Sequence, residues 1–195
     1  AAHESRFGAG AARFRQDAAE GWVDTVWNGC YWKYIADQVG PLREDLPRLE
    51  DNDFNARVRA LGYGLYLAPE IKAYYYPRES LRELWRQYAA NGYGVGWALL
   101  RHRRCLGLRH LAPLALTAGL TLSLTMALAW PPVLSMVGCY LLAVALFSAL
   151  AWRRRPGWHV ALLPLVFAVL HTSYGLGTVH GLLGALLARQ PSRRF

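Results

Sequence analysis

Residues 50–63 read Glu50-Asp51-Asn52-Asp53-Phe54-Asn55-Ala56-Arg57-Val58-Arg59-Ala60-Leu61-Gly62-Tyr63. Within this stretch Phe54, Val58 and Leu61 are spaced four and three residues apart, which predicts one apolar stripe along an α-helix. Gly62 follows the last of them, and a glycine at that place is typical of a helix end. The stretch therefore predicts a helix with one apolar side, and the rest of the chain is arranged around it.

The start of this expected helix is acidic. Glu50, Asp51 and Asp53 lie where the helix dipole favours negative charge. Asp53 and Arg57 are four residues apart in the order that favours an ion pair, which adds about 0.3 kcal/mol to helix stability. Asp51 shares the apolar stripe with Phe54, so we expect its carboxylate to point toward packed structure or a cleft. It is either an N-terminal cap or a general base kept ionised near neutral pH.

The formal net charge of +9 is divided unevenly along the sequence. All 13 acidic residues lie at or before Glu83, whereas arginines continue to the C-terminal end. These arginines bracket long apolar runs instead of lining a polar face, which is typical of a protein that meets anionic lipid headgroups. The pattern predicts membrane lipids as partners and excludes nucleic acid.

Two apolar runs in the second half are long enough to cross a membrane. Residues 111–130 and 133–152 each hold 20 residues without a formal charge, the length that a bilayer core requires. Pro131 and Pro132 separate them, so we expect a helical hairpin. Arginines precede the first run and follow the second at 153–155, and the positive-inside rule places both flanks in the cytoplasm.

Residues 158–188 form a third apolar run, which four glycines interrupt. A single span there would place the basic tail at 189–195 outside the cell, against the charge rule. A re-entrant or interfacial segment would keep that tail inside, and the sequence leaves both arrangements open.

Another helix is expected before these runs. Ser80 and Glu83 have the spacing of a capping box, which opens a helix. Its apolar stripe consists of Leu81, Leu84, Trp85 and Tyr88. Because arginines and a membrane span follow, we expect this stripe to rest on the membrane surface.

The pattern Glu50-Asp51-x-Asp53-Phe54-x-x-Arg57, ending in Gly62-Tyr63, resembles the Glu-Asp motif of glycosyltransferase family 2. The segment from Tyr76 through Gln87 most resembles its membrane-bound subgroup for succinoglycan-type exopolysaccharide biosynthesis. The resemblance implies an α/β fold with membrane helices. Residues 1–79 would form the acceptor-side half of a nucleotide-diphospho-sugar transferase (GT-A-like) fold. Residues 80–110 would form an amphipathic interface helix and a basic linker. Two or three transmembrane or interfacial helices would follow at 111–188, and a basic tail at 189–195.

The same resemblance implies an enzyme of the inverting hexosyltransferase type, incomplete in this chain. It would move a sugar from a nucleotide-sugar donor to a lipid-linked or other glycan acceptor at the inner (cytoplasmic) membrane, with several spans and a cytoplasmic catalytic part. Residue by residue, it assigns catalysis to Asp51 and Glu50, with Asp51 as the base. It assigns substrate binding to Asp53, Arg57, Gly29, Arg78 and Gln87.

Three features qualify this expectation. Asn91 and Gly92 replace the Arg and Trp of the family's Gln-x-x-Arg-Trp motif, which favours transfer of one or few sugars. The family's Mg or Mn ion is held by an Asp-x-Asp pair. Asp51 and Asp53 have that spacing but lie inside the Glu-Asp motif, so we expect the metal ligands upstream, in a longer polypeptide of which this is the C-terminal portion. The competing interpretation is a non-catalytic membrane anchor or interaction subunit.

Four aromatic residues precede the central helix: Trp27, Tyr31, Trp32 and Tyr34. They either pack in the core or form a platform on which a sugar ring of the acceptor stacks. The sequence leaves these two readings open.

Overall fold

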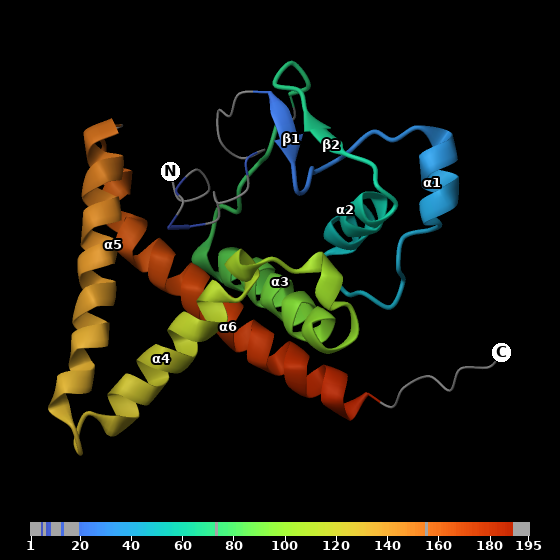
Figure 1. Ribbon diagram of the computed structural model, residues 1–195. Coiled ribbons are helices and arrows are strands. Elements are labelled where there is room, and N and C mark those ends of the chain that lie inside the picture. The colour runs from blue at the N-terminus through green and yellow to red at the C-terminus, as the bar shows by residue number, and fades with distance from the viewer. Residues whose placement is uncertain are drawn as a thin grey trace.

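The computed structural model describes residues 5, 7–8, 13, 20–72, 74–154 and 156–188. Arg155, most of 1–20 and the tail at 189–195 lie outside the described residues, and so do the expectations that concern them. The chain is mostly helical, with a small strand-containing part at one end and long helices at the other (Figure 1). The expected combination of a small α/β part with apolar helices is therefore present, but a GT-A-like fold is not shown by it.

The strand-containing part has one two-stranded antiparallel sheet. Strand β1 (Gly21–Val23) pairs with β2 (Leu65–Leu67), with Trp22 opposite Tyr66. Helices α1 (Lys33–Val39) and α2 (Glu50–Ala60) follow β1. Between Tyr63 and Tyr76, the described residues form one strand, Leu65–Leu67, whose partner in the sheet is the three-residue β1.

Helix α2 confirms the central prediction for Phe54 and Val58 but not for Leu61, which follows the helix and is 49% exposed. Phe54 and Val58 are buried and pack with Ile35 of α1 and Leu65 of β2. The chain turns after the helix at Gly62, whose φ of +87° is one that glycine adopts most easily. The capping interpretation of Asp51 is wrong, because the N-cap position is Leu49 and no side chain caps the helix there.

Helix α3 (Leu81–Arg101) begins as predicted, because the Ser80 hydroxyl accepts a hydrogen bond from the Glu83 backbone N–H at 3.2 Å. Its apolar stripe is divided between two environments. Leu84 and Tyr88 are buried against helix α6, whereas Leu81 and Trp85 are exposed. The expectation that the whole stripe rests on lipid is therefore wrong for the two buried residues.

The apolar half forms α4 (Ala112–Met126), α5 (Leu134–Arg154) and α6 (Leu163–Leu187), and α4 and α5 make a hairpin whose turn holds Pro131 (Figure 1). Helix α4 has 15 residues, about 22 Å at 1.5 Å per residue, against a bilayer core of about 30 Å. The prediction of a full-length helix over 111–130 is therefore wrong. In the part of the chain that the structure describes, the helices long and apolar enough to cross a membrane are Pro131–Arg154 and Trp158–Leu187.

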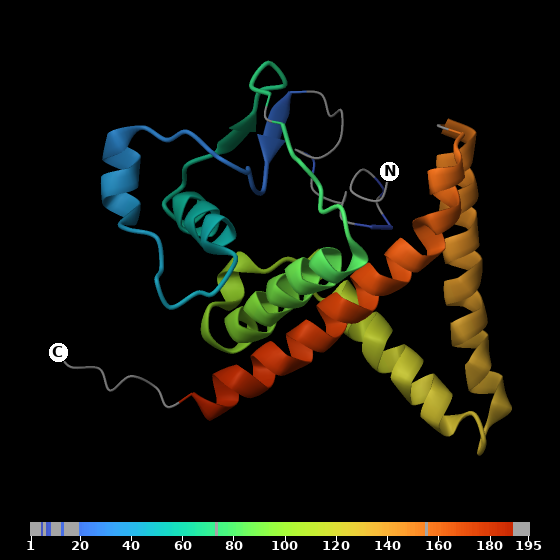
Figure 2. The ribbon, with the colours of Figure 1, turned by 180° about the vertical axis from the view of Figure 1, so that it is seen from behind.

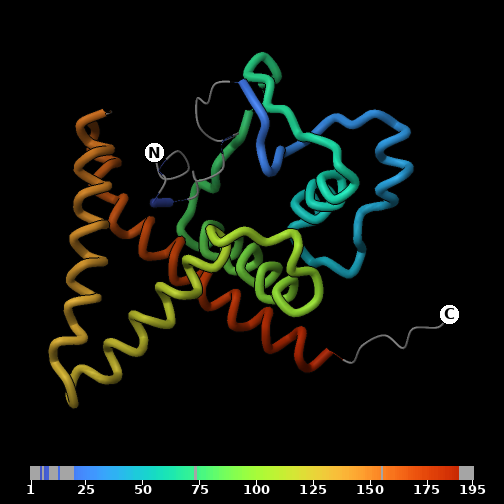
Figure 3. Tube along the Cα trace, in the orientation of Figure 1, coloured from blue at the N-terminus to red at the C-terminus, as the bar shows by residue number. Residues whose placement is uncertain are grey.

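Helices α3 and α6 run side by side in the same direction, as the ribbon seen from behind and the Cα tube also show (Figures 2 and 3). A Cβ atom added at Gly92 or Gly96 of α3 would overlap the backbone of α6. A Cβ atom added at Gly177 or Gly181 of α6 would overlap the backbone of α3. The glycines thus act as small residues that let two backbones touch. They do not interrupt α6.

Candidate functional site

The polar residues of α2 divide between two sides of the helix. At 100° per residue, Asp51 and Asn55 share a side with Val58, whereas Asp53 and Arg57 lie on the opposite side. The first side faces the loop after β1, and the second faces the end of α3. Asp51 and Asn55 therefore belong to one site, and Asp53 and Arg57 belong to another.

Asp51 is exposed to solvent at the start of α2, beside half-buried Glu50. Of the two environments expected for its carboxylate, packed structure or a cleft, packed structure is wrong, because Asp51 is exposed while Phe54 and Val58 fill the core. Partial burial nevertheless raises the pKa of Asp51 above its usual value, and the Glu50 carboxylate raises it further. A carboxylate that is accessible and more basic than usual suits a proton acceptor.

A buried hydrogen-bond network lies behind Asp51. Asn55 is 0% exposed, and its amide donates to Thr25 Oγ1 at 2.8 Å and to the Val26 carbonyl at 2.9 Å. The Tyr31 hydroxyl donates to Asn55 Oδ1 at 2.6 Å. Asn55 therefore fixes the loop after β1 against α2. Sequence analysis missed it, although a polar residue next to the stripe of Phe54 and Val58 is the signal that could have found it.

Replacing Asn55 with alanine is expected to lower the free energy of unfolding by about 3 kcal/mol, because the buried partners at Thr25, Val26 and Tyr31 lose their hydrogen bonds together. Thermal unfolding of the purified protein measures the loss. The matched control is Asn52→Ala, which removes only the bond from Thr25 Oγ1 and should cost about 1 kcal/mol. Equal losses in the two variants would contradict the central role of Asn55.

Gly29 lies on the same side as Asp51. A Cβ atom there would come within 2.8 Å of Tyr31 Cζ and of Val26 Cγ2, so the loop packs this tightly only with glycine. Of the aromatic cluster, only Tyr31 packs against the core, whereas Trp27 and Trp32 are 42% and 73% exposed. Tyr34 is exposed as well. Core packing therefore fails for three of the four aromatic residues.

Gln87 reaches the same loop from α3. Its side-chain amide donates to the Tyr75 hydroxyl at 2.9 Å, and the Tyr75 ring meets Trp27 edge to face at 6.4 Å. The Gln87 Oε1 atom is buried without a hydrogen-bond partner among the described residues. Arg78 is exposed between β2 and α3 and has no ion-pair partner in the described part of the chain. The structure therefore brings Gln87 toward Trp27 but does not bring Arg78 to Asp51.

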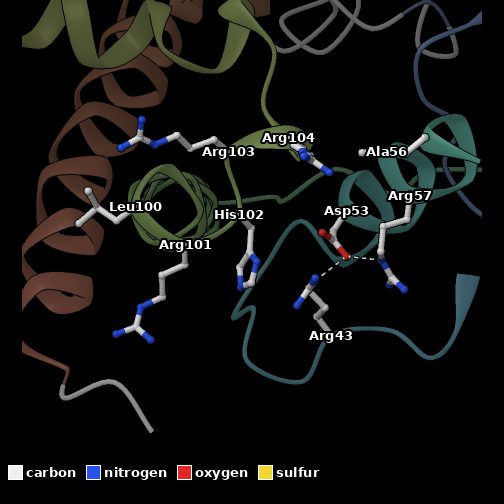
Figure 4. Close-up of a pocket in the computed structure, with 10 residues that line it drawn as sticks. Arg43, Asp53, Ala56, Arg57, Leu100, Arg101, His102, Arg103 and Arg104 are labelled. Atoms are coloured by element: carbon white, nitrogen blue, oxygen red, sulfur yellow. Dashed lines mark hydrogen bonds and ion pairs between the residues drawn. The ribbon is translucent and has the colours of Figure 1, made fainter. Parts of the chain in front are cut away.

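The opposite side of α2 faces a cleft of about 480 Å³, which we call the arginine cleft (Figure 4). It is lined by Arg43, Arg57, Arg101, Arg103 and Arg104, together with His102 and Asp53. Asp53 is 6% exposed and pairs with Arg57 at 2.8 Å and with Arg43 at 3.2 Å.

Arg57 also supports the loop before α2, because it donates to the carbonyls of Val39 at 2.6 Å and Pro41 at 2.9 Å. The predicted Asp53–Arg57 pair is thus present and structural. The thiol of Cys105 lies nearby, and burial raises its pKa to about 11, so it is no nucleophile at neutral pH.

The family resemblance implies a divalent cation, but the described residues of this chain do not form a site that fits one. Among the residues that the structure describes, no group of three His, Cys, Asp or Glu side chains is placed to hold a metal ion. Asp51 and Asp53 point to opposite sides of α2, so they cannot share one ion. The described residues therefore do not supply the ligand set of a divalent cation.

Comparison with known proteins gives one informative match. The chain is 30% identical over 114 residues to the succinoglycan biosynthesis protein ExoA of Rhizobium meliloti (strain 1021). The aligned region covers 58% of this chain and 34% of that protein. The chain thus matches about a third of the relative's length. No family model matches the chain, and no solved structure matches it.

Proposed function

We propose that this chain is the acceptor-side and membrane portion of a family 2 glycosyltransferase that assembles an exopolysaccharide. The observation that carries the proposal is the accessible Asp51 carboxylate at the start of α2, in the stretch that resembles the Glu-Asp motif. The similarity to a succinoglycan biosynthesis protein supports the same class of function. The donor in this proposal is a nucleotide sugar, and the acceptor is a lipid-linked glycan.

The reaction in this proposal is a single displacement with inversion at the anomeric carbon. An acceptor hydroxyl attacks that carbon while its proton passes to the Asp51 carboxylate. The bond from the anomeric carbon to the diphosphate oxygen breaks, and its electron pair leaves with the nucleoside diphosphate. Glu50 keeps Asp51 basic through like-charge repulsion, which raises the Asp51 pKa. A divalent cation would have to be held by residues outside this chain, and it would neutralise the negative charge of the leaving group.

The exposed aromatic residues give the acceptor a place beside Asp51. Trp27 lies in the loop that Asn55 fixes, and its ring contacts Tyr75. A flat, exposed indole held in one place is suited to stack on a sugar ring. Gln87 then acts from the α3 side by holding Tyr75, which is how we interpret its predicted place in substrate binding.

We also propose that the α4–α5 hairpin crosses the inner membrane and that α6 lies along its surface. Helix α4 alone is shorter than a bilayer core, and in this proposal the apolar residues 127–130, which follow it, complete the crossing. Loop residues Leu46 and Leu49 pack on α3 at Ala98, so α3 carries the strand-containing part on one side and α6 on the other. An α6 that crossed the bilayer would draw α3 and its charged first turns in with it, at a cost of about 3 kcal/mol per charge. In agreement, 44% of the apolar window of α6 is buried in protein, against 6% for α5.

Reporter fusions test this topology. A reporter placed at Pro132 is expected to be external, and reporters placed after Arg154 and after Ala188 are both expected to be cytoplasmic. The reason is that arginines flank the hairpin on its cytoplasmic side and that α6 does not cross. Alkaline phosphatase fusions are active on the external side of the membrane, and green fluorescent protein fusions are fluorescent on the cytoplasmic side. An external reporter after Ala188 would show that α6 spans the membrane.

A further inference from the structure

The arginine cleft holds more positive charge than its own carboxylate neutralises. Among the described residues, Asp53 is the only acidic residue that lines it, and its two partners Arg43 and Arg57 already surround it at 3.2 and 2.8 Å. A second carboxylate, that of Asp45, pairs with His102 at 2.7 Å. The charges on Arg101, Arg103 and Arg104 are left to be balanced by something else.

The contacts of these three arginines are to neutral groups. Arg101 donates to the carbonyls of Ala185 and Ala188, and Arg103 donates through Nε to the carbonyl of Leu99. Within the part of the chain that the structure describes, the Arg104 side chain has no hydrogen-bond or ion-pair partner. Figure 4 shows Arg104 between α3 and α2, whereas Arg101 and Arg103 extend away from Asp53.

This composition fits a polyvalent phosphate better than it fits a sugar. Each guanidinium offers a planar fork of N–H donors that matches phosphate oxygens, and Arg104 has all of its donors available. Among the described residues, no Phe, Tyr or Trp side chain lines the cleft to stack on a sugar, and its one ring, that of His102, is paired with Asp45. Its volume of about 480 Å³ lies within the range of small-ligand sites.

The position of the cleft decides between two sources of diphosphate. In a nucleotide sugar the diphosphate is bonded to the anomeric carbon under attack, so only that carbon and the attacking hydroxyl separate it from the catalytic base. The arginine cleft lies across α2 from Asp51, and a helix with its side chains is about 10 Å thick. The diphosphate of a lipid-linked glycan can lie that far away, because sugars separate it from the attacked hydroxyl.

The cleft is also next to the membrane part of the chain. Arg101 is tied to the end of α6, and the short 3₁₀ helix η2 (Arg103–Cys105) belongs to the linker that leads into α4. A group anchored in the bilayer by a lipid chain can therefore reach it. Electrostatic attraction by the unpaired arginines favours an anion that arrives at this surface.

We propose that the arginine cleft binds the diphosphate group that joins a membrane lipid to the acceptor glycan, with Arg104 as its main ligand and Arg43 at its edge. The proposal rests on the proposed function, since it names the chemistry of that acceptor. It adds that at least one sugar lies between the diphosphate and the hydroxyl that attacks. Asp51 and the cleft thereby hold the two ends of one acceptor.

The test is a binding measurement on the full-length protein in nanodiscs of neutral lipid, so that it does not depend on sugar transfer. The three probes are a polyprenyl diphosphate incorporated in the disc, a soluble nucleoside diphosphate, and phosphatidylglycerol incorporated in the disc. Arg104→Gln is expected to weaken binding of the polyprenyl diphosphate about tenfold or more, because a charge-assisted hydrogen bond pair is lost. Arg104→Lys should recover part of that loss.

The matched control is Arg153→Gln, which removes the same charge from the exposed end of α5 and should leave binding of the lipid diphosphate unchanged. Equal weakening by both variants, or equal weakening for phosphatidylglycerol, would reduce the cleft to a general anionic-lipid contact and overturn the proposal. Weakening confined to the nucleoside diphosphate would overturn the lipid assignment. If lipid diphosphate binding needs Arg104 but the protein transfers no sugar, the cleft stands and the proposed function fails.

Discussion

Replacing Asp51 with asparagine in the full-length protein is expected to slow sugar transfer by a factor of about 10² to 10⁴, because the reaction loses its general base. Asparagine has almost the same size, and Asp51 makes no side-chain cap that the substitution could break. The protein should therefore fold, enter the membrane and bind its donor. Single-turnover measurements separate the transfer step from binding and product release.

The pH dependence provides a second measurement of the same residue. A base works only when it is ionised, so transfer by the unmodified protein should fall as the pH drops through the Asp51 pKa. That pKa is raised above its usual value of 3.8 by burial and by Glu50, so the loss should begin at a higher pH than for an ordinary aspartate. The residual activity of Asp51→Asn should lack this acidic limb.

Asp53→Asn is the control, because its carboxylate lies on the other side of α2 and pairs with Arg43 and Arg57. It should lower stability by about 3 kcal/mol because Arg43 and Arg57 lose the carboxylate that they share, while the transfer step keeps its base. If Asp51→Asn retains more than about a tenth of the normal transfer rate in single-turnover measurements, Asp51 is not the base.

Adding one methyl group at Gly181 is expected to separate α3 from α6. The Cβ atom of Gly181→Ala would overlap the backbone of Tyr93, which cannot move aside as a flexible side chain can. Overpacking of this kind costs about 3 kcal/mol, which lowers the midpoint of thermal unfolding by roughly 6–12 °C in a chain of this size. Thermal unfolding in detergent measures the shift.

Gly138 provides the matched control in α5, because nothing lies within 4 Å of the position where its Cβ atom would stand. The same glycine-to-alanine change at Gly138 should be neutral or stabilise the helix by about 0.5–1 kcal/mol. A Gly181→Ala protein as stable as the Gly138→Ala protein would show that α3 and α6 do not touch as described. The contact also positions Gln87 of α3, so its loss should affect the loop that holds Trp27.

Several features of this protein follow from the sequence alone because their causes are local. The bounds of α2 and the start of α3 depend on residues three or four apart, such as Ser80 and Glu83, and these contacts form inside one helix. The Asp53–Arg57 pair follows from the same helical spacing. The similarity to a succinoglycan biosynthesis protein likewise agrees with the class of function that the Glu-Asp motif indicated.

Other features depend on partners that lie far away in the sequence. The glycines at 177 and 181 read as interruptions of an apolar run until α3 is seen to lie against them. Asn55 is an ordinary helix residue until Thr25 and Tyr31 meet it across the core. Tertiary structure alone decides which side of a helix is covered, because helical period gives the sides but not their neighbours.

The two sides of α2 show this division most clearly. The sequence placed Asp51 and Asp53 in one motif, and their spacing put them on opposite sides of a helix. Only the structure shows that Asp51 is exposed to solvent and that the buried hydrogen bonds of Asn55 lie behind it. Arg43 and Arg104 are 61 residues apart in the sequence, and only the structure shows that they line the same cleft on the Asp53 side of α2. Such convergence arises from the packing of α2 on α3, which no local pattern encodes.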